Sequence, residues 1–398
     1  MTPFNSTFDV ARLPAIHFAD GAIEQLPQII ARYGGSALLV TGKASFLATA
    51  QWQSLTAELH QLDIAWHQFG VADEPSPTLI DEAVALHRGH DIKVVVGIGG
   101  GSVLDAAKAI AGLLITGDSV MDHLEGVGRG IPYRGPAVPL VAVPTTAGTG
   151  SEATKNAVLS VRGKRGFKKS FRDAQLVAEI AVIDPQLLAS CPSILLAANG
   201  MDAFTQLLES YVSLRASPFT DALASSGMQA FRDGFWPAWE KSEGAAEGRA
   251  RMAYASLCSG ITLAQAGLGS VHGLASPLGA FFPIPHGIVC GTLVAAATRV
   301  NIDVLRRRDP GNPALRKYAE AGLLLGGRMY DSEEQAQDGL VELLEGWTQR
   351  LSLPHLSHFG MQQGDIERVV ANCRGGSMQT NPIRLTDEEV AQVLQARL

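Results

Sequence analysis

The sequence predicts an α/β domain built on a parallel sheet, followed by a mostly α-helical domain. In the first half, apolar β-branched runs alternate with segments of helical periodicity, and glycines and prolines separate many short elements. This alternation is typical of a parallel sheet flanked by helices. After about Pro192 the runs give way to long segments with apolar residues at helical spacing. We therefore expect two domains, 1–190 and 191–398, with a cleft between them.

The predicted sheet contains at least four buried strands. They are Ala37–Thr41, Ile92–Gly97, Val138–Val143 and Glu179–Asp184. A helix is expected at Pro77–His87, and a second, alanine-rich helix follows directly on three consecutive glycines at Gly99–Gly101. Strand, turn and helix thus recur in the order that a parallel sheet requires.

The second half is predicted to be helical over most of its length. We expect helices at Leu195–Leu214, Pro218–Phe235, Ala245–Ala266, Leu315–Tyr330 and Ser332–Leu351. A last helix begins after Thr386, because a Thr followed by Glu389 three residues later is the pattern of a capping box.

Composition favours a globular enzyme of small molecules. The 398 residues are 46% hydrophobic and 18% charged, which excludes a disordered tail. The formal net charge is -7 and we find no clustered Lys/Arg stripe, so neither nucleic acid nor an anionic membrane is an expected partner. The four cysteines are far apart without a C-x-x-C pair, and we expect four free buried thiols.

The N-terminus predicts a cytoplasmic protein. Residues 1–7 lack a basic stretch followed by an apolar one, which a secretory leader would show. No later segment offers about 18 uninterrupted apolar residues, so a membrane span is not expected.

The glycine turn Gly99-Gly-Gly-Ser102 suggests a phosphate-binding site. Glycine allows close approach of the backbone to a pyrophosphate and permits positive φ, and the following helix points its free N–H groups at the anion. Ser102 stands where the dinucleotide fingerprint G-x-G-x-x-G has its third glycine, so a merely tight turn explains this pattern as well.

A second loop strengthens the nucleotide interpretation. Pro144-Thr-Thr-Ala-Gly-Thr-Gly-Ser-Glu152 follows the next strand and offers four hydroxyl groups. A loop that caps its own helix is the alternative. Both loops would lie at the carboxyl edge of one sheet, where α/β proteins bind ligands.

The second half offers candidate metal ligands. Asp202 and Gln206 share one helix face by their i, i+4 spacing, and His272 and His286 follow. One carboxylate and two imidazoles suit iron or zinc, although isolated histidines are more often packed in cores or loops. His87 and His90 are interpreted as a solvated helix end.

Together these motifs resemble the iron-containing, or group III, alcohol dehydrogenases over nearly the whole chain. In order, the motifs are Gly99-Gly-Gly-Ser102, Pro144-Thr-Thr-Ala-Gly-Thr-Gly-Ser-Glu152, Asp184-Pro185, Gly200-Met-Asp-Ala203, His272-Gly-Leu-Ala-Ser-Pro-Leu-Gly279 and Pro285-His286-Gly287. The resemblance implies a Rossmann-like dinucleotide domain, an all-α C-terminal domain in a dehydroquinate synthase-like architecture, a divalent metal (Fe or Zn), NAD or NADP, and a homodimer.

The resemblance also implies roles for individual residues. Asp202, His272 and His286 match three of the four metal ligands of the family. The cofactor-binding positions, by correspondence, are Gly99, Gly100, Gly101, Ser102, Thr145, Thr146, Thr149 and Lys168.

This chain departs from the family pattern at three places. The fourth family ligand is a histidine, and here that position is Gln206, whose amide is a weaker donor. A second histidine associated with proton relay is replaced by Ser276. NAD-specific members carry an acidic residue after the first strand, whereas this chain has Gly42 and Lys43, which favours acceptance of NADPH without excluding NADH.

The expected activity is metal-dependent, NAD(P)-linked alcohol oxidation or carbonyl reduction at the cleft between the domains. Gln206 keeps open a metal-independent reductase that resembles maleylacetate reductases. A lyase of the dehydroquinate-synthase type, which uses nicotinamide only transiently, is a further alternative, and a catalytically dead binding protein is the least favoured.

Overall fold

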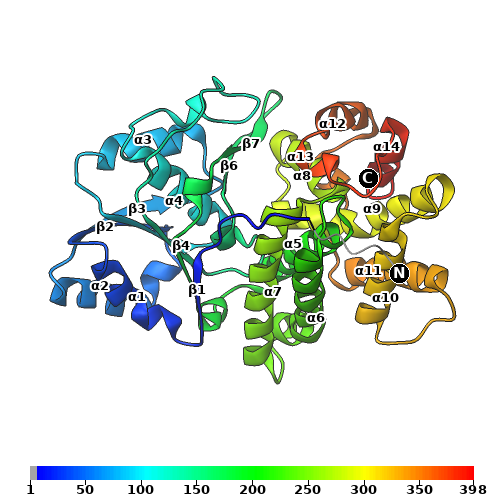
Figure 1. Ribbon diagram of the computed structural model, residues 1–398, viewed down its shortest axis with the longest axis horizontal. Coiled ribbons are helices and arrows are strands. Elements are labelled where there is room, and N and C mark those ends of the chain that lie inside the picture. Colours follow the sequence, from blue (N-terminus) through cyan, green and yellow to red (C-terminus); the bar gives the residue numbers. More distant parts are fainter. Residues whose placement is uncertain (1–6) are drawn as a thin grey trace. The chain divides into compact units, whose positions relative to one another are not determined.

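A computed structural model describes residues 7–398 of the chain. It divides into two compact units (Figure 1). The sheet unit comprises residues 11–161 and 168–191. The helical unit comprises 162–167, 192–398 and the described residues up to Val10. Each unit is described by itself below.

The sheet unit is built on six parallel strands in the order β1-β8-β5-β4-β2-β3. The strands are β1 (Ala15–Phe18), β2 (Ser36–Gly42), β3 (Ala65–Val71), β4 (Val94–Gly99), β5 (Leu140–Pro144) and β8 (Ile180–Ile183). The four predicted strands are the central ones. The two that the sequence did not reveal, β1 and β3, lie at the edges, where residues are less buried and the apolar run is correspondingly broken.

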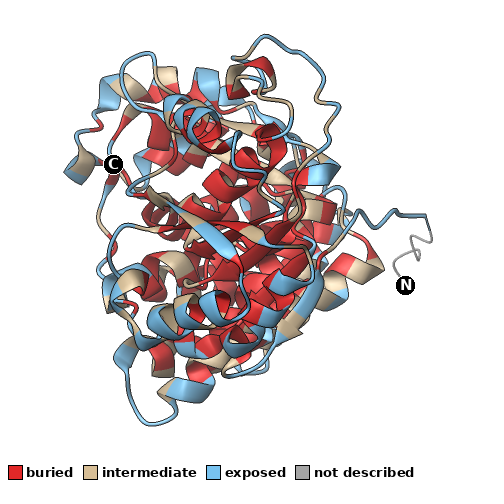
Figure 2. Ribbon diagram, turned by 90° about the vertical axis from the view of Figure 1, so that its left-hand side faces the viewer, coloured by how far each residue is buried: buried red, intermediate tan, exposed pale blue. Residues whose placement is uncertain are grey.

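Alternate residues of the central strands bury one face of the sheet. Val94, Val96 and Ile98 of β4 belong to one core cluster with residues of β2, β5 and β8 and with the helices before and after β2. On the opposite face Gly97 lies against the helix that follows β4, since a Cβ there would meet Cβ of Ala107 at 2.8 Å. Figure 2 shows the buried interior surrounded by exposed helix surfaces and loops.

Four α-helices and a small hairpin complete the sheet unit. The helices are α1 (Leu26–Ala31), α2 (Ala50–Gln61), α3 (Pro77–His87) and α4 (Gly101–Leu113). The hairpin pairs β6 (Asn156–Val161) with β7 (Phe167–Arg172). The helix predicted at Pro77–His87 is confirmed, with Ser76 as its N-cap.

The helical unit contains ten α-helices in the part of the chain that the structure describes. They are α5 (Ser193–Val212), α6 (Pro218–Glu240), α7 (Ala245–Ala266), α8 (Ser270–Phe281), α9 (His286–Arg308), α10 (Pro313–Gly326), α11 (Glu333–Arg350), α12 (Ile366–Asn372), α13 (Gly376–Gln379) and α14 (Asp387–Gln395). The predicted capping box is confirmed, because Thr386 accepts from the backbone of Glu389 while the Glu389 side chain accepts from the backbone of Thr386.

Among the described residues, α9 alone is long and apolar enough to cross a membrane by length and composition. Its most apolar window is 83% buried inside the protein. The helix packs against α5, α8 and α11, and we interpret it as the core helix of this unit.

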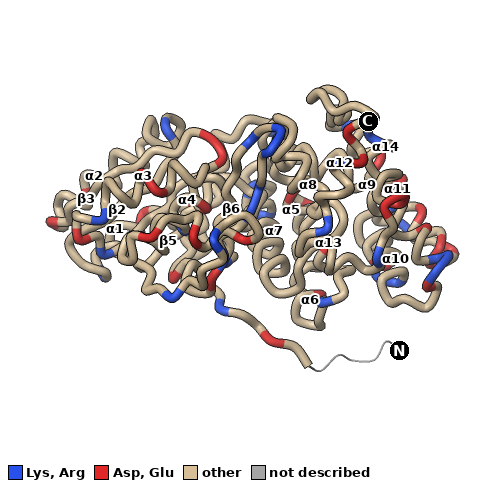
Figure 3. The backbone as a smooth tube through the Cα atoms, turned by 90° about the horizontal axis from the view of Figure 1, so that it is seen from above, with Lys and Arg blue, Asp and Glu red and all other residues tan. Residues whose placement is uncertain are grey.

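Charged residues are distributed over both units, with acidic and basic residues interspersed along the chain (Figure 3). The densest basic segment is the β6–β7 hairpin, which carries six Lys or Arg residues between Arg162 and Arg172. Two of them are paired, Lys168 with Glu74 and Arg172 with Glu125.

Candidate active site

The glycine turn connects β4 directly to α4. Gly100 is the N-cap of α4 and has φ -76, and none of the three glycines has positive φ. The expectation that these glycines supply positive φ is therefore wrong. They are required for space, because a Cβ on Gly99 would meet Val103 at 2.6 Å.

The second predicted loop lies against this turn. β4 and β5 are parallel neighbours, with Gly99 opposite Pro144. Thr145 donates its backbone N–H to the carbonyl of Gly99 over 3.0 Å. A Cβ on Gly101 would meet Thr149 Cγ2 at 2.6 Å. The two loops predicted from the sequence thus meet at the carboxyl edge of the sheet, where the free N–H groups of the first turn of α4 suit a phosphate.

A buried lysine ties the second loop to α4. Lys108 is fully buried and donates to Ser151 Oγ over 2.7 Å and to Thr154 Oγ1 over 2.8 Å. Asp105, one turn earlier on α4, lies 3.6 Å from the Lys108 ammonium and accepts the Ser151 hydroxyl. Burial lowers the pKa of Lys108 and raises that of Asp105. This network of hydrogen bonds fixes the second loop against α4.

The remaining predicted cofactor residues lie on other strands of the sheet unit and at their ends. Gly42 ends β2, and Lys43 follows it with an exposed side chain. Lys168 on β7 forms an ion pair with Glu74, its Nζ being 2.6 Å from Oε1.

Asp202, His272 and His286 come together in the helical unit. They belong to three helices, α5, α8 and α9, and His286 is the first residue of α9. Oδ1 of Asp202 lies 3.2 Å from Nε2 of His272 and 3.6 Å from Nε2 of His286. Burial raises the pKa of Asp202, but the imidazoles of His286 and His272 outweigh it and hold that pKa at about 2. The ionised carboxylate and two imidazoles suit a divalent cation.

Glu209 contacts His272 on the ring nitrogen that faces away from Asp202. Its Oε2 lies 2.6 Å from Nδ1 of His272, and its Oε1 accepts the backbone N–H of Val271 over 2.6 Å. A carboxylate on the outer nitrogen of a histidine is the usual support of a metal ligand. The sequence reading did not single out Glu209, although it lies seven residues after Asp202 and hence two turns along the same helix face.

Gln206 and Ser276, the two residues that stand where the family pattern has histidines, have different surroundings. Gln206 is buried, and its Oε1 accepts the hydroxyl of Ser259 over 2.8 Å. Ser276 lies four residues after His272 on α8 and is half-buried. Their predicted roles in metal binding and proton relay stay predictions.

A cysteine that the sequence reading assigned to the core lies in the cluster. All four cysteines are free and buried, as expected. The Sγ of Cys290, however, lies 3.6 Å from Nε2 of His272 and 3.9 Å from Nε2 of His286. Cys290 could have been found in the sequence by the spacing His286-x-x-x-Cys290. This spacing places both residues on one helix face, provided that α9 begins at His286.

A second histidine group occurs in the sheet unit. His67, His87 and His90 bring one ring nitrogen each within 4.8 Å of one another. The rings of His67 and His90 are stacked 4.1 Å apart and 6° from parallel. The lone pairs of two stacked, parallel rings lie in two separate parallel planes, so they do not converge on one ion in this arrangement. His87 is buried, so the interpretation of a solvated helix end is wrong for this residue, whereas His90 is exposed as that interpretation predicts.

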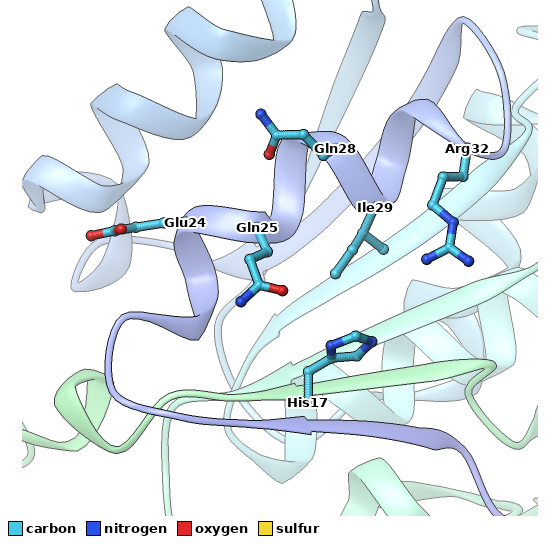
Figure 4. A pocket seen from close by; sticks show the side chains of 6 residues that line it. All are labelled: His17, Glu24, Gln25, Gln28, Ile29 and Arg32. Carbon is cyan, nitrogen blue, oxygen red and sulfur yellow. The ribbon is translucent and has the colours of Figure 1, made fainter.

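A surface pocket in the sheet unit carries none of the predicted site residues (Figure 4). It lies between β1 and the residues from Glu24 to Arg32, which include α1. Its lining residues are His17, Glu24, Gln25, Gln28, Ile29 and Arg32.

Two family models together match almost the whole chain. The family model for iron-containing alcohol dehydrogenase matches residues 14–185, and that for the C-terminal region of the Fe-containing alcohol dehydrogenase family matches residues 196–398. The chain belongs to the iron-containing alcohol dehydrogenase family. Members of this family use a nicotinamide cofactor and a divalent metal.

Individual relatives of this iron-containing alcohol dehydrogenase align over almost its whole length. Alcohol dehydrogenase 4 of Saccharomyces cerevisiae is 30% identical over 389 residues, 96% of each chain. Long-chain-alcohol dehydrogenase 1 of Geobacillus thermodenitrificans is 31% identical over 396 residues, 97% of this chain and 96% of the relative. A crystal structure of a 1,3-propanediol oxidoreductase superposes with a TM-score of 0.88 at 27% identity, covering 98% of this chain and 100% of the other.

Proposed function

We propose that this enzyme interconverts a small-molecule alcohol and its aldehyde or ketone by hydride transfer to and from NAD(P), with a divalent metal held by Asp202, His272 and His286. The observation that carries the proposal is the convergence of the Asp202 carboxylate with the Nε2 atoms of both histidines, 3.2 Å and 3.6 Å away. These donors fit iron or zinc by type and by spacing.

When bound there, the metal supplies Lewis acidity that lowers the pKa of an alcohol hydroxyl and polarises a carbonyl. The protein contributes position and charge. Asp202 is ionised in its buried place. Glu209 fixes the ring orientation of His272. Ser276, one helical turn beyond His272, is our candidate for holding the proton that the alcohol loses.

The cofactor is proposed to bind at the carboxyl edge of the sheet. Gly99, Gly100, Gly101 and Ser102 offer a close backbone and the N-terminus of α4 to the pyrophosphate. Thr145, Thr146 and Thr149 offer hydroxyls from the adjoining loop. Gly42 and Lys43 carry no negative charge at the end of β2, which supports acceptance of the NADP 2′-phosphate as well as NAD.

The oligomeric state of the enzyme and its location in the cell are part of the same proposal. We expect a homodimer, which the family resemblance supports, and a cytoplasmic location. Sedimentation of the purified enzyme and fractionation of the source cells test them.

The deciding experiment measures metal content. Protein purified without chelator, and again after anaerobic reconstitution with Fe or Zn, should hold about one tight ion per chain. His286→Ala should lose that ion and the NAD(P)H-linked activity with it. His358→Ala, which removes an exposed histidine of the same unit, is the matched control and should lose neither.

Two other outcomes would select the alternatives. Carbonyl reduction without an ion under either condition would favour a metal-independent reductase of the maleylacetate-reductase type, which the neutral Gln206 keeps open. Product formation without net NAD(P)H turnover would favour a lyase of the dehydroquinate-synthase type.

A further inference from the structure

Cys290 is placed as a metal ligand would be. Its side chain is fully buried, one helical turn after His286 on α9. Together with Asp202, His272 and His286 it offers one donor atom each, and all four atoms lie within 4.8 Å of one another. The sulfur is thus the fourth corner of a compact group whose other three corners are the proposed ligands.

Four of the six separations within this group are close to the edges of a tetrahedral zinc site. With zinc–nitrogen or zinc–oxygen bonds of about 2.05 Å and a zinc–sulfur bond of about 2.3 Å, tetrahedral angles give N···O edges of about 3.3 Å and S···N edges of about 3.6 Å. The corresponding N···O separations are 3.2 Å and 3.6 Å. The S···N separations are 3.6 Å and 3.9 Å.

We propose that the Cys290 thiolate is the fourth protein ligand of the divalent metal, in place of the histidine that the family carries at the position of Gln206. The inference rests on the metal site of the proposed function. On metal binding, the S–H bond of Cys290 breaks, its proton passes to solvent, and the sulfur forms a bond to the metal instead. Thiolate is a soft donor, and the site is therefore biased toward zinc relative to an all-nitrogen and oxygen site.

Gln206 is the less suitable fourth ligand. Its amide oxygen lies 2.8 Å from the Ser259 hydroxyl, whose single proton it shares with the backbone carbonyl of Ser256, also 2.8 Å away. A neutral amide also leaves the two positive charges of the ion opposed by Asp202 alone, whereas Asp202 and a thiolate together balance them. Zinc in catalytic sites at times takes a fifth ligand, so four protein ligands are compatible with alcohol chemistry.

Cobalt(II) substitution tests the thiolate directly. The purified full-length enzyme is stripped of metal anaerobically and titrated with Co²⁺, and the absorption spectrum is recorded. A bound thiolate gives an intense sulfur-to-cobalt charge-transfer band in the near ultraviolet, which nitrogen and oxygen ligands do not give. We expect this band to saturate at about one Co²⁺ per chain. Cys290→Ser should lose it, and Cys258→Ala, which removes a buried cysteine of α7, should keep it.

The outcomes separate this inference from the proposed function. If wild-type enzyme binds Co²⁺ without the charge-transfer band, the thiolate ligand is wrong while the metal site stands. If it binds no Co²⁺ and no other ion, the metal-dependent function fails as well. The wild-type spectrum decides even if Cys290→Ser does not fold.

Metal preference provides the second readout. Equal Zn²⁺ and Fe²⁺ are offered anaerobically to wild type and to Cys290→Ser, and the bound ratio is measured by elemental analysis. Any such site prefers zinc to ferrous iron to some extent, so the change between the two proteins is the test. We expect the zinc-to-iron ratio to fall at least about tenfold in Cys290→Ser, and an unchanged ratio would overturn the inference.

Discussion

Nδ1 of His272 lies 2.6 Å from Oε2 of Glu209, while Nε2 of the same ring lies 3.2 Å from Oδ1 of Asp202. An imidazole that donates from Nδ1 presents the lone pair of Nε2 on its other side. Glu209 therefore selects the form of His272 that can bind a metal, and it does so from the same helix that carries Asp202.

Replacing Glu209 should weaken metal binding without removing a ligand. In Glu209→Gln the amide accepts one hydrogen bond but turns its NH₂ group toward another donor, so His272 is held less well. We expect the metal affinity to fall about 10–100-fold in competition with a chromophoric chelator. Glu345→Gln, which changes a half-buried glutamate that pairs with Arg299, should have no effect. Equal affinity of Glu209→Gln and wild type would show that Glu209 does not tune His272.

The site could be predicted from sequence only in part. Asp202, His272 and His286 were found through family resemblance, because spacing alone does not show that α5, α8 and α9 bring them together. Cys290 and Glu209 were missed, since their relation to the ligands depends on α9 beginning at His286 and on α5 running through Glu209 without a break.

The fold was more predictable at its centre than at its edges. The runs of β4 and β5 are buried at every residue, so apolar composition alone reveals them. Edge strand β3 has only Val71 fully buried, and its mixed residues resemble a loop. Helices α8 and α9 flank the metal ligands with glycines and prolines that obscure helical periodicity.

The close contact between the two cofactor loops predicts the effect of enlarging Gly101. In Gly101→Ala the new Cβ would meet Thr149 Cγ2 at 2.6 Å, so the second cofactor loop, Pro144–Glu152, must shift. We expect this shift to remove one hydrogen bond to a phosphate of the cofactor. That loss should raise the KM measured for the cofactor about tenfold. Gly346→Ala on α11, where a Cβ meets nothing within 4 Å, is the control.

A double variant distinguishes this clash from a general disturbance. Thr149→Ala removes the atom that the new Cβ would meet, so Gly101→Ala should add little to the KM of Thr149→Ala. Additive effects of the two substitutions would contradict the steric account.

Lys43 is expected to control the choice between NADP and NAD. Lys43→Glu replaces a cation beside the end of β2 with a carboxylate that repels the 2′-phosphate. We expect kcat/KM for NADPH relative to NADH to fall by about 10–100-fold. Lys241→Glu makes the same charge change at an exposed position of the helical unit and should leave the ratio unchanged. A similar loss with both cofactors would point to a folding defect.

The buried ion pair between Lys108 and Asp105 predicts that removing Lys108 causes a large loss of stability. A second substitution at Asp105 should restore part of it. In Lys108→Met the carboxylate of Asp105 loses its cation, and Ser151 and Thr154 lose a donor. The free energy of unfolding in urea should fall by about 3–5 kcal/mol. Lys108→Met with Asp105→Asn should be less destabilised than Lys108→Met alone, because the Asp105 carboxylate is no longer left unpaired beside the missing ammonium. If the double variant is the less stable of the two, repulsion from a lone carboxylate is not the cause.

The histidine group around His87 predicts that acid weakens the sheet unit. Both ring nitrogens of His87 are buried, and among the described residues neither has a hydrogen-bond partner. Burial, followed by repulsion from His67 and His90, lowers the pKa of His87 below its usual 6.5. As the pH falls through that value, the unfolded chain takes up a proton before the folded chain does. The contribution to stability is therefore intact above about pH 6.5 and is lost as the pH falls below it.

His87→Phe should reduce this acid sensitivity. A phenyl ring keeps the edge contact with Phe69, whose ring centre lies 6.1 Å from that of His87, and it cannot take up a proton. The fall in Tm between about pH 7.5 and about pH 5.5 should be smaller in His87→Phe than in wild type. His60→Phe, which changes an exposed histidine of α2, should follow wild type. Because His60→Phe also removes one titrating histidine, comparison with it isolates the effect of burial at His87. Identical slopes for all three proteins would show that the His87 ring is protonated as readily in the folded chain as in the unfolded one.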